Sequence, residues 1–329
     1  MSAAQGPWVI VMAGGSGVRL QRVTTRRDGV TVPKQFCSLR HGRSLLQDAV
    51  GRAQQLTPRQ RIVVVVAAEH EVWWRPQLED LLAENVLAQP LNRGTAVGLL
   101  LAVAHVLARD GRARIAALPS DHYIEQPAVL MATLQRAVHR TAVDRQRVFL
   151  LGISPDAPDT EYGWIVAGPA DRDVHTVEEF VEKPASPQAA ELLRRGALWH
   201  SFVLAADART LWRLGEQVCP AVTSALAVWQ QAQPAHRNAL LAAVYGELPA
   251  LDFARDLLPG NERLLGLLRV PPCGWTDLGT PERLGSCIER LLRRPAPSLP
   301  QRPTVPARPA VAPFLDLMQV VREQRLGSI

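Results

Sequence analysis

A glycine-rich run near the N-terminus is the first part of the chain whose residue types suggest chemistry. It consists of Gly14, Gly15, Ser16 and Gly17, and it directly follows the apolar residues 8–12. A glycine loop between a strand and a helix lets backbone N–H groups approach an anion, and the helix N-terminus adds favourable partial charge. The run matches neither the GxGxxG dinucleotide pattern nor the Walker motif. It therefore predicts a phosphate site, with an ordinary tight turn as the alternative.

Three basic residues are candidates for binding the phosphate. Arg19 falls in the first turn of the expected helix, where its charge opposes the helix dipole by about 0.3–1 kcal/mol and is more useful if it holds a phosphate. Of the 37 basic residues, only Lys34 and Lys183 are lysines. Because this sequence otherwise uses arginine for positive charge, each lysine is a candidate for presenting a compact ammonium group to a phosphoryl group. The alternative is that both are ordinary surface lysines.

Two aspartates are candidate metal ligands. Asp121 follows an apolar run at residues 114–118, and Asp277 lies in the segment Gly-Trp-Thr-Asp at residues 274–277. Mg²⁺ typically takes one or two protein carboxylates together with waters and substrate phosphates, so this pair would suffice. Each aspartate could instead cap a helix or occupy a turn. The neighbouring His122 is more often a structural residue than a ligand.

The elements that must position these residues are predicted by hydrophobic periodicity. Four apolar runs, at residues 8–12, 62–67, 114–118 and 148–153, are separated by stretches with helical periodicity. A run without polar alternation suits a strand covered on both faces, which predicts a doubly wound, mostly parallel α/β sheet. In such sheets ligands bind beyond the carboxyl ends of the strands, where the glycine run and Asp121 are found. The pattern of residues 160–205 predicts an insertion that forms the second wall of a cleft, and residues 207–264 are predicted to be mostly helical.

The C-terminal part of the chain differs in composition from the rest. Prolines at every third position in residues 293–313 predict a semi-rigid polyproline linker. Residues 314–329 begin with apolar residues at helical spacing and predict a short amphipathic helix and tail. We expect this helix either to dock on the body of the protein or to form a surface for a partner or a second copy of the chain. Residues 1–292 are expected to form one α/β domain that carries all of these candidate residues.

Composition excludes several classes of protein. Hydrophobic residues make up 47% of the 329 residues and charged residues 21%, which fits a globular protein rather than a disordered or collagen-like chain. Residues 293–313 contain four arginines and no acid, so most of the net charge of +6 lies there and no nucleic-acid binding is expected. The longest apolar stretch, residues 95–108, is shorter than the roughly 20 residues of a membrane span. Four scattered cysteines and no signal-like segment predict reduced thiols and a cytoplasmic location.

The motifs, taken in order, resemble those of the sugar-1-phosphate nucleotidyltransferases, and most closely the mannose-1-phosphate guanylyltransferases. The resemblance spans about residues 8–290. The residues that carry it are 14–20 (GGSGVRL), 33–36 (PKQF), 92–96 (NRGTA), 118–122 (LPSDH), 162–165 (YGWI), 180–184 (FVEKP) and 274–277 (GWTD). Each motif alone is weak, and their common order gives the resemblance its specificity.

The resemblance implies a Rossmann-like nucleotidyltransferase fold and a role for each motif. The glycine loop and Arg19 would hold the triphosphate of GTP, and Lys34 would contact its phosphates. Asp121 and Asp277 would share Mg²⁺. The base and ribose would lie near Pro90, Gly94 and Thr95, and a hexose 1-phosphate would face Gly163, Glu182, Lys183 and His200. The implied reaction forms GDP-mannose and pyrophosphate from GTP and mannose 1-phosphate by in-line attack on the α-phosphate, without a general base.

The sequence departs from the family pattern at two places. Residues 199–202 read Trp-His-Ser-Phe where the family usually has Trp-Asn-Ser-Gly, so His200 replaces an asparagine of the sugar site. The loop between Leu20 and Pro33 is longer than in most guanylyltransferases, and Arg22 stands where the family typically has a proline. The alternatives that remain are a transferase for another hexose 1-phosphate, and a catalytically silent relative that binds nucleotide sugar and regulates a partner through residues 293–329. A glycosyltransferase is a further alternative, but it would want an Asp-x-Asp motif. No second enzymatic domain is expected.

Overall fold

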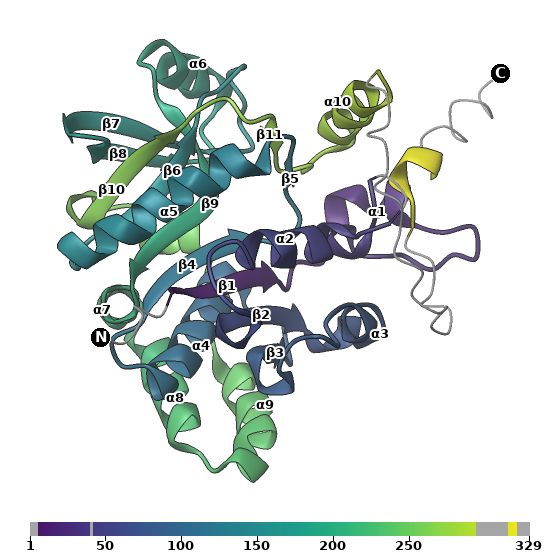
Figure 1. Cartoon of the computed structure of the whole chain (residues 1–329), viewed down its shortest axis with the longest axis vertical. Helices are drawn as coiled ribbons and strands as arrows, with labels where there is room; N and C mark the ends of the chain where they lie inside the picture. Colours follow the sequence, from purple (N-terminus) through teal and green to yellow (C-terminus); the bar gives the residue numbers. More distant parts are fainter. Residues whose placement is uncertain (1–5, 40–41, 294–314, 321–329) are drawn as a thin grey trace.

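The computed structural model describes residues 6–39, 42–293 and 315–320 (Figure 1). The strands of its main sheet are β1 Trp8–Ala13, β2 Ile62–Ala67, β3 Val86–Gln89, β4 Arg114–Pro119, β6 Val148–Ile153, β7 Gly163–Asp171, β8 Val174–Glu182, β9 Leu198–Asp207 and β10 Leu265–Val270. They form one nine-stranded sheet in the order β3-β2-β1-β4-β9-β6-β10-β8-β7. A separate two-stranded sheet joins β5 Tyr123–Ile124 to β11 Trp275–Thr276.

One half of the main sheet is parallel, as the apolar runs predict. β1 pairs in parallel with β2 and β4, and β2 pairs in parallel with β3. In β2 the side chains of Val63 and Val65 enter one core cluster, and those of Val64 and Val66 enter the other. The strand is therefore covered on both faces, which explains its lack of polar alternation.

The other half of the sheet is mainly antiparallel, so the prediction of a mostly parallel sheet is wrong for this half. β9 pairs antiparallel with both β4 and β6, so residues 199–205 lie in the middle of the main sheet rather than in an inserted wall. β8 pairs antiparallel with β7 and β10, and the wall consists of β7 and β8. Like the parallel strands, β9 is buried on both faces. Hydrophobic periodicity reports burial and not strand direction, so the sequence could not distinguish the two arrangements.

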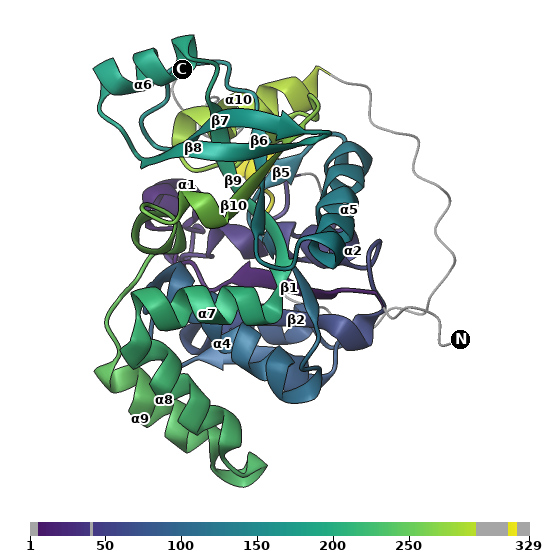
Figure 2. The ribbon, with the colours of Figure 1, turned by 90° about the vertical axis from the view of Figure 1, so that its left-hand side faces the viewer.

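Helices cover both faces of the sheet. The core cluster of one face includes residues of four helices: α2 Leu45–Ala53, α5 Pro127–Val143, α6 Ser186–Arg194 and α10 Pro281–Leu292. The core cluster of the other face includes residues of α4 Gly94–Arg109, α7 Ala208–Val218, α8 Pro220–Gln231 and α9 Arg237–Glu247. Figure 2 shows α4 and α7 on one side of the sheet and α2 and α5 on the other. The short helices α1 Gln21–Thr24 and α3 Glu71–Trp74 complete the set of described α-helices. The predicted α/β sheet with helices on both faces is confirmed.

The C-terminal segment is described only in part. The proline-rich residues 294–314 and residues 321–329 lie outside the described structure. Residues 315–320 dock on the body, where Asp316 forms a parallel bridge with Ser38 and Leu317 is fully buried. None of the helices in the described ranges is long and apolar enough to cross a membrane.

Candidate active site

The site is organised by the carboxyl ends of β1 and β4, which are neighbours in the sheet. Met12 pairs with Pro119, and the Ser120 N–H donates to the Met12 carbonyl at 2.9 Å. This pairing places the glycine loop after β1 beside Asp121 and His122 after β4. The position agrees with the rule that ligands of open α/β sheets bind beyond the strand ends.

The glycine loop is held in place by the side chain of a buried glutamine. The Nε2 atom of Gln35 donates to the carbonyls of Ala13 (3.1 Å) and Gly15 (2.7 Å), and Gln35 is only 2% exposed. A side chain at Gly14 would meet a second buried amide, because an ideal Cβ there would lie 2.5 Å from Nε2 of Gln89. Neither glutamine was among the predicted site residues. The signal for Gln35 was its place beside Lys34, whereas no local signal pointed to Gln89.

The element after the glycine loop is shorter than predicted. Gly17 has a φ of 61° and is followed by a 3-10 turn, Val18–Leu20, and then by the four-residue α1. This turn contains Arg19, so the dipole of a long helix does not contribute here. Among the described residues, the groups available to bind an anion here are therefore the backbone N–H groups of the loop and the nearby basic side chains.

Lys34 lies at the centre of the site. It is 6% exposed, its Nζ atom lies 3.0 Å from Oδ2 of Asp121, and it donates to the carbonyls of Asp277 (2.5 Å) and Leu278 (3.3 Å). The ammonium group thus joins the end of β4 to the segment after β11. The structure brings the predicted Lys34, Asp121 and Asp277 together, and the interpretation of Lys34 as an ordinary surface lysine is wrong.

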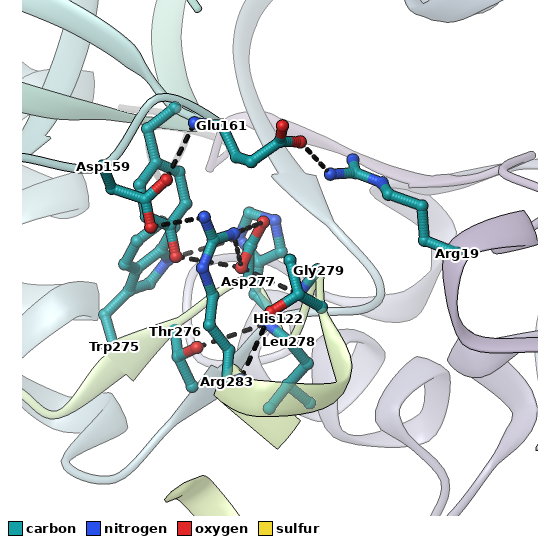
Figure 3. A network of polar contacts seen from close by, with 12 residues as sticks. Arg19, His122, Asp159, Glu161, Trp275, Thr276, Asp277, Leu278, Gly279 and Arg283 are labelled. Carbon is teal, nitrogen blue, oxygen red and sulfur yellow. Dashed lines mark hydrogen bonds and ion pairs between the residues drawn. The ribbon is translucent and has the colours of Figure 1, made fainter. Parts of the chain in front are cut away.

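Both predicted metal ligands carry negative charge in this environment. Burial is the largest single effect and would raise the pKa of Asp121, but the charge of Lys34, its hydrogen bond and the neighbouring His122 together lower the pKa below its usual value. Burial is likewise overcome at Asp277, whose pKa is lowered by the facing charges, which include Arg283. The Asp277 Oδ1 atom accepts from the Tyr162 hydroxyl at 2.9 Å. It also accepts from Arg283 at 2.9 Å (Figure 3).

The carboxylate pair fits a Mg²⁺ ion. Asp121 and Asp277 line one cavity of about 330 Å³, and the negative charge of Asp277 acts to raise the pKa of Asp121, as expected of two carboxylates that share a site. Among the described residues no group of three or more His, Cys, Asp or Glu side chains could hold a metal. Mg²⁺ keeps several waters and substrate phosphates as ligands, so two hard oxygen donors meet its needs.

The side chain of His122 packs against Trp275. Its Nδ1 atom lies 3.2 Å from the Nε1 donor of Trp275, and the two rings stack edge to face with centroids 5.2 Å apart. Burial lowers its pKa to about 4, so the ring is neutral at pH 7. The ring is thus held by packing and by its contact with Trp275, and its structural role stays a prediction of the sequence.

A network of charged side chains surrounds Asp277 and reaches Arg19 (Figure 3). Arg283 bonds to Asp277 and to Asp159 (2.5 Å), and its guanidinium lies 4.0 Å from the centroid of the Tyr162 ring. Arg19 forms an exposed ion pair with Glu161, two residues along the same loop as Asp159. Arg283 is six positions from Asp277, but Asp159 is 124 positions from Arg283 and Glu161 is 142 positions from Arg19. No local sequence signal therefore pointed to Asp159 or Glu161.

Two adjoining cavities share Asp121 and His122. The second cavity also measures about 330 Å³ and is lined by Gly14, Gly15, Gln35, Gln89, Gly94, Thr95, Ser120, Phe202 and Asp252, among others. Gly94 has a φ of 82°, and an ideal Cβ there would lie 2.2 Å from the Leu251 carbonyl, so only glycine fits. Thr95 donates to Asp252 at 2.9 Å. Pro90, which follows β3, and Ser16 are described residues that line neither of these two cavities.

The predicted sugar-facing residues converge at the start of β7. An ideal Cβ on Gly163 would lie 2.5 Å from Oε2 of Glu182 and 3.3 Å from Cβ of His200. Glu182 Oε2 and His200 Nε2 are buried, and neither has a hydrogen-bond partner among the described residues. Burial, assisted by the charge of Asp252, raises the pKa of Glu182 to about 7, and burial lowers that of His200 to about 4. The exposed Lys183 has a φ of 47°, and its N–H donates to the Tyr162 carbonyl (3.2 Å).

Comparisons with known proteins agree with this arrangement. The model of the family described as nucleotidyl transferase matches residues 8–293. XanB, the xanthan biosynthesis protein of Xanthomonas campestris pv. campestris (strain B100), is 34% identical over 195 residues, which cover 58% of this chain and 40% of that protein. The mannose-1-phosphate guanylyltransferase of Sinorhizobium fredii (strain NBRC 101917 / NGR234) is 31% identical over 279 residues, 82% of this chain and 52% of that one. The chain thus spans about half or less of the length of these relatives.

Solved structures show the same fold. A crystal structure described as mannose-1-phosphate geranyltransferase from Thermus thermophilus superposes with a TM-score of 0.72 at 32% identity, covering 83% of this chain and 76% of that one. A structure described as mannose-6-phosphate isomerase from Helicobacter pylori has a TM-score of 0.64 at 17% identity, covering 82% of this chain and 99% of that one. The second likeness concerns the fold alone.

Proposed function

Because the chain belongs to the nucleotidyl transferase family, we propose that it makes a nucleotide sugar and pyrophosphate from a nucleoside triphosphate and a hexose 1-phosphate. GTP and mannose 1-phosphate are the proposed substrates, since relatives at 31–32% identity are named mannose-1-phosphate guanylyltransferases. The proposal agrees with the motifs of the sequence. It concerns the described domain, whatever further parts its longer relatives contain.

The observation that carries the proposal is the position of Lys34, which pairs with the Asp121 carboxylate and donates to the backbone carbonyl of Asp277. Lys34 lines one of the two cavities that meet at Asp121 and His122. One cavity adjoins the glycine loop, Gly94 and Thr95, where we place the nucleoside and its α-phosphate. The other adjoins Gly17 and Arg19, where we place the leaving pyrophosphate. Lys34 and Arg19 would neutralise the charge that repels the attacking sugar phosphate.

The residues of the chain need only align the two substrates and neutralise their negative charge, because the sugar phosphate is already an anionic nucleophile. Its phosphate oxygen attacks the α-phosphorus in line, the bond to the bridging oxygen of the β-phosphate breaks, and pyrophosphate leaves with the electron pair. Asp121 and Asp277 are the residues that would hold Mg²⁺, which when bound supplies positive charge to the phosphate oxygens. Lys34 fixes Asp121 at 3.0 Å and so keeps this carboxylate oriented.

The buried and unpartnered polar atoms of the sugar wall support a polyhydroxylated substrate. Glu182 Oε2 and His200 Nε2 are both buried without a partner among the described residues, and Gly163 packs so closely against Glu182 that a Cβ there would lie 2.5 Å from Oε2. Buried polar groups normally have hydrogen-bond partners, so these atoms suit hydroxyl groups of a bound sugar. His200 in place of the family's asparagine favours a second candidate function, in which the hexose is not mannose.

Pyrophosphate release, measured with Mg²⁺ for four nucleoside triphosphates against several hexose 1-phosphates, tests the proposal. We expect the highest kcat/KM with GTP, and the best sugar decides between mannose and another hexose. The Lys34→Arg protein is the matched control, because its charge and fold are retained while the compact ammonium is lost. Absence of release with every pair, from a protein that still binds nucleotide sugar, would support the catalytically silent alternative.

A further inference from the structure

The described C-terminal segment contacts the loop that carries Lys34. The N–H of Ser38 donates to the Leu315 carbonyl (3.0 Å), and the N–H of Leu317 donates to the Ser38 carbonyl (2.9 Å). Both backbone groups of Ser38 are therefore paired with residues that lie more than 270 positions away in the sequence. Ser38 is itself 1% exposed, so these groups have no access to water as a substitute partner.

The segment is anchored by its own side chains. Leu317 is 0% exposed and belongs to the core cluster that also contains Phe36 and Leu39. Asp316 is 8% exposed, and its carboxylate accepts from the N–H of Met318 at 2.9 Å, which closes the first helical turn after the bridge. A buried leucine and a capped turn make this a specific contact.

The loop held in this way connects the segment to the centre of the site. Lys34–Phe36 form a 3-10 turn that ends where the Cys37 N–H donates to the Lys34 carbonyl at 3.0 Å. From this turn Lys34 reaches Asp121, and Gln35 reaches the carbonyls of the glycine loop. The turn thus holds both the carboxylate and the loop. On its C-terminal side the backbone is held by the Leu45 N–H, which donates to the Cys37 carbonyl at 3.0 Å, and then by the two bonds of Ser38 to the C-terminal segment.

We propose that residues 315–320 are a positioning segment for the active site, in which Leu317 and the bridge to Ser38 hold the Lys34 turn in the geometry that its contacts require. The proposal rests on the proposed function for the role of Lys34 in turnover. The placement of the turn can also be read without activity. Because a misplacement of about 1 Å can cost roughly 10²-fold in rate, loss of this support acts on kcat more than on KM.

Cys37 provides a readout that is independent of catalysis. Its thiol is 0% exposed and adjoins Ser38, and burial raises its pKa to about 12, so it reacts slowly while the loop stays closed. Cys287 on α10 is equally buried and serves as an internal reference for global opening. Labelling of each cysteine with iodoacetamide in the folded full chain is followed by peptide mass spectrometry.

The test compares Leu317→Ala with Leu192→Ala. Leu192 lies on α6, is 1% exposed and belongs to the same core cluster, so its truncation controls for a general loss of stability. We expect Leu317→Ala to raise Cys37 labelling at least about tenfold relative to Cys287 and to lower kcat at least about tenfold, with KM for the sugar phosphate within about threefold. Leu192→Ala should do neither, and the volume-conserving Leu317→Met should restore both properties.

The outcomes separate this proposal from the proposed function. If Cys37 labelling and kcat respond alike in the Leu317 and Leu192 variants, the proposal is overturned. It is overturned as well if labelling rises while kcat stays unchanged, because the segment would then hold the loop without positioning Lys34. If no substrate pair is turned over, the proposed function fails, and selective Cys37 labelling still shows whether the segment holds the turn. If Leu317→Ala does not fold, Asp316→Ala, which removes the turn cap and keeps the buried leucine, is measured in the same way.

Discussion

The Nζ atom of Lys34 lies 3.0 Å from the Oδ2 atom of Asp121, and the same amine donates to the carbonyl of Asp277. One buried ammonium group therefore contacts both segments that carry the candidate metal ligands. A carboxylate and two carbonyls around one nitrogen match the three donors of an ammonium group. A planar guanidinium places its donors in a fixed fork and would not fit the same three acceptors.

The first prediction follows from this geometry. Lys34→Arg should lower kcat by about 10²–10³-fold, because loss of one well-placed donor to developing charge typically costs that much. Thermal unfolding of the variant should stay cooperative, since the charge is kept. Steady-state kinetics together with a melting curve check this prediction. Near-normal turnover in a folded variant would remove Lys34 from the mechanism.

The local motifs made this part of the site predictable from the sequence. Gly14 and Asp121 belong to short segments that follow apolar runs, and the carboxyl ends of adjacent parallel strands must meet at one edge of the sheet. The rare use of lysine added a signal that does not depend on the fold. Four of the strands were likewise predicted, because burial on both faces leaves a continuous apolar run.

The parts that the sequence did not reveal depend on contacts between distant segments. Arg283 and Asp159 are 124 positions apart, and either could have been an ordinary surface charge. The place of β9 between β4 and β6 likewise depends on tertiary pairing, which hydrophobic periodicity does not record. The length of the element after Gly17 was overestimated because a glycine loop alone does not fix how many turns follow it.

The two aspartates should act as one unit. Asp121→Asn and Asp277→Asn should each lower Mg²⁺-dependent activity by at least about 10²-fold, because a bound metal contributes several kcal/mol of charge stabilisation. The double variant should lose much less than the product of the two effects, since residues that share one function are non-additive. Activity titrated with Mg²⁺ in the four proteins measures this coupling. Independent, multiplicative losses would exclude a shared metal.

The ion pair between Arg19 and Glu161 should compete with the triphosphate for the guanidinium group. Both side chains are about half exposed, at 52% and 44%, so the pair contributes at most about 1 kcal/mol. Glu161→Gln should therefore lower KM for the nucleotide by up to about fivefold at low salt, and less at high salt. The matched control is Glu179→Gln, which removes a similarly exposed pair with Arg195. An equal change in both variants would show a general effect of net charge.

The raised pKa of Glu182 should make stability depend on pH. Burial, with the charge of Asp252, raises this pKa from 4.5 to about 7, so the folded protein holds a proton that the unfolded chain has released. The folded state binds more protons between pH 4.5 and 7, and the contribution of Glu182 to stability falls as the pH rises through this range. Glu182→Gln should abolish this loss of stability with rising pH. The melting temperature of the variant should therefore increase relative to that of the wild type from about pH 5 to about pH 8. Glu178→Gln, an exposed change on the same strand, should leave the pH profile as it is.

The last prediction concerns His200 and the choice of sugar. Its ring is 7% exposed, it is neutral because burial lowers its pKa to about 4, and its Nε2 atom has no partner among the described residues. Phe180 packs against the ring with centroids 5.3 Å apart, which restricts its rotation. Asparagine would offer a donor and an acceptor on one short amide, whereas neutral histidine offers one of each on opposite ring edges.

The second candidate function therefore predicts that the wild-type protein uses mannose 1-phosphate poorly or prefers another hexose 1-phosphate, and that His200→Asn shifts it toward mannose. An unpaired buried polar group costs about 1–3 kcal/mol, which corresponds to roughly 5- to 150-fold in kcat/KM. Measuring kcat/KM for mannose and glucose 1-phosphates in both proteins gives the ratio of the two specificities. The ratio corrects for any general loss of activity in the variant, because such a loss affects both sugars equally. An unchanged ratio would mean that His200 only packs against Phe180 and takes no part in sugar recognition.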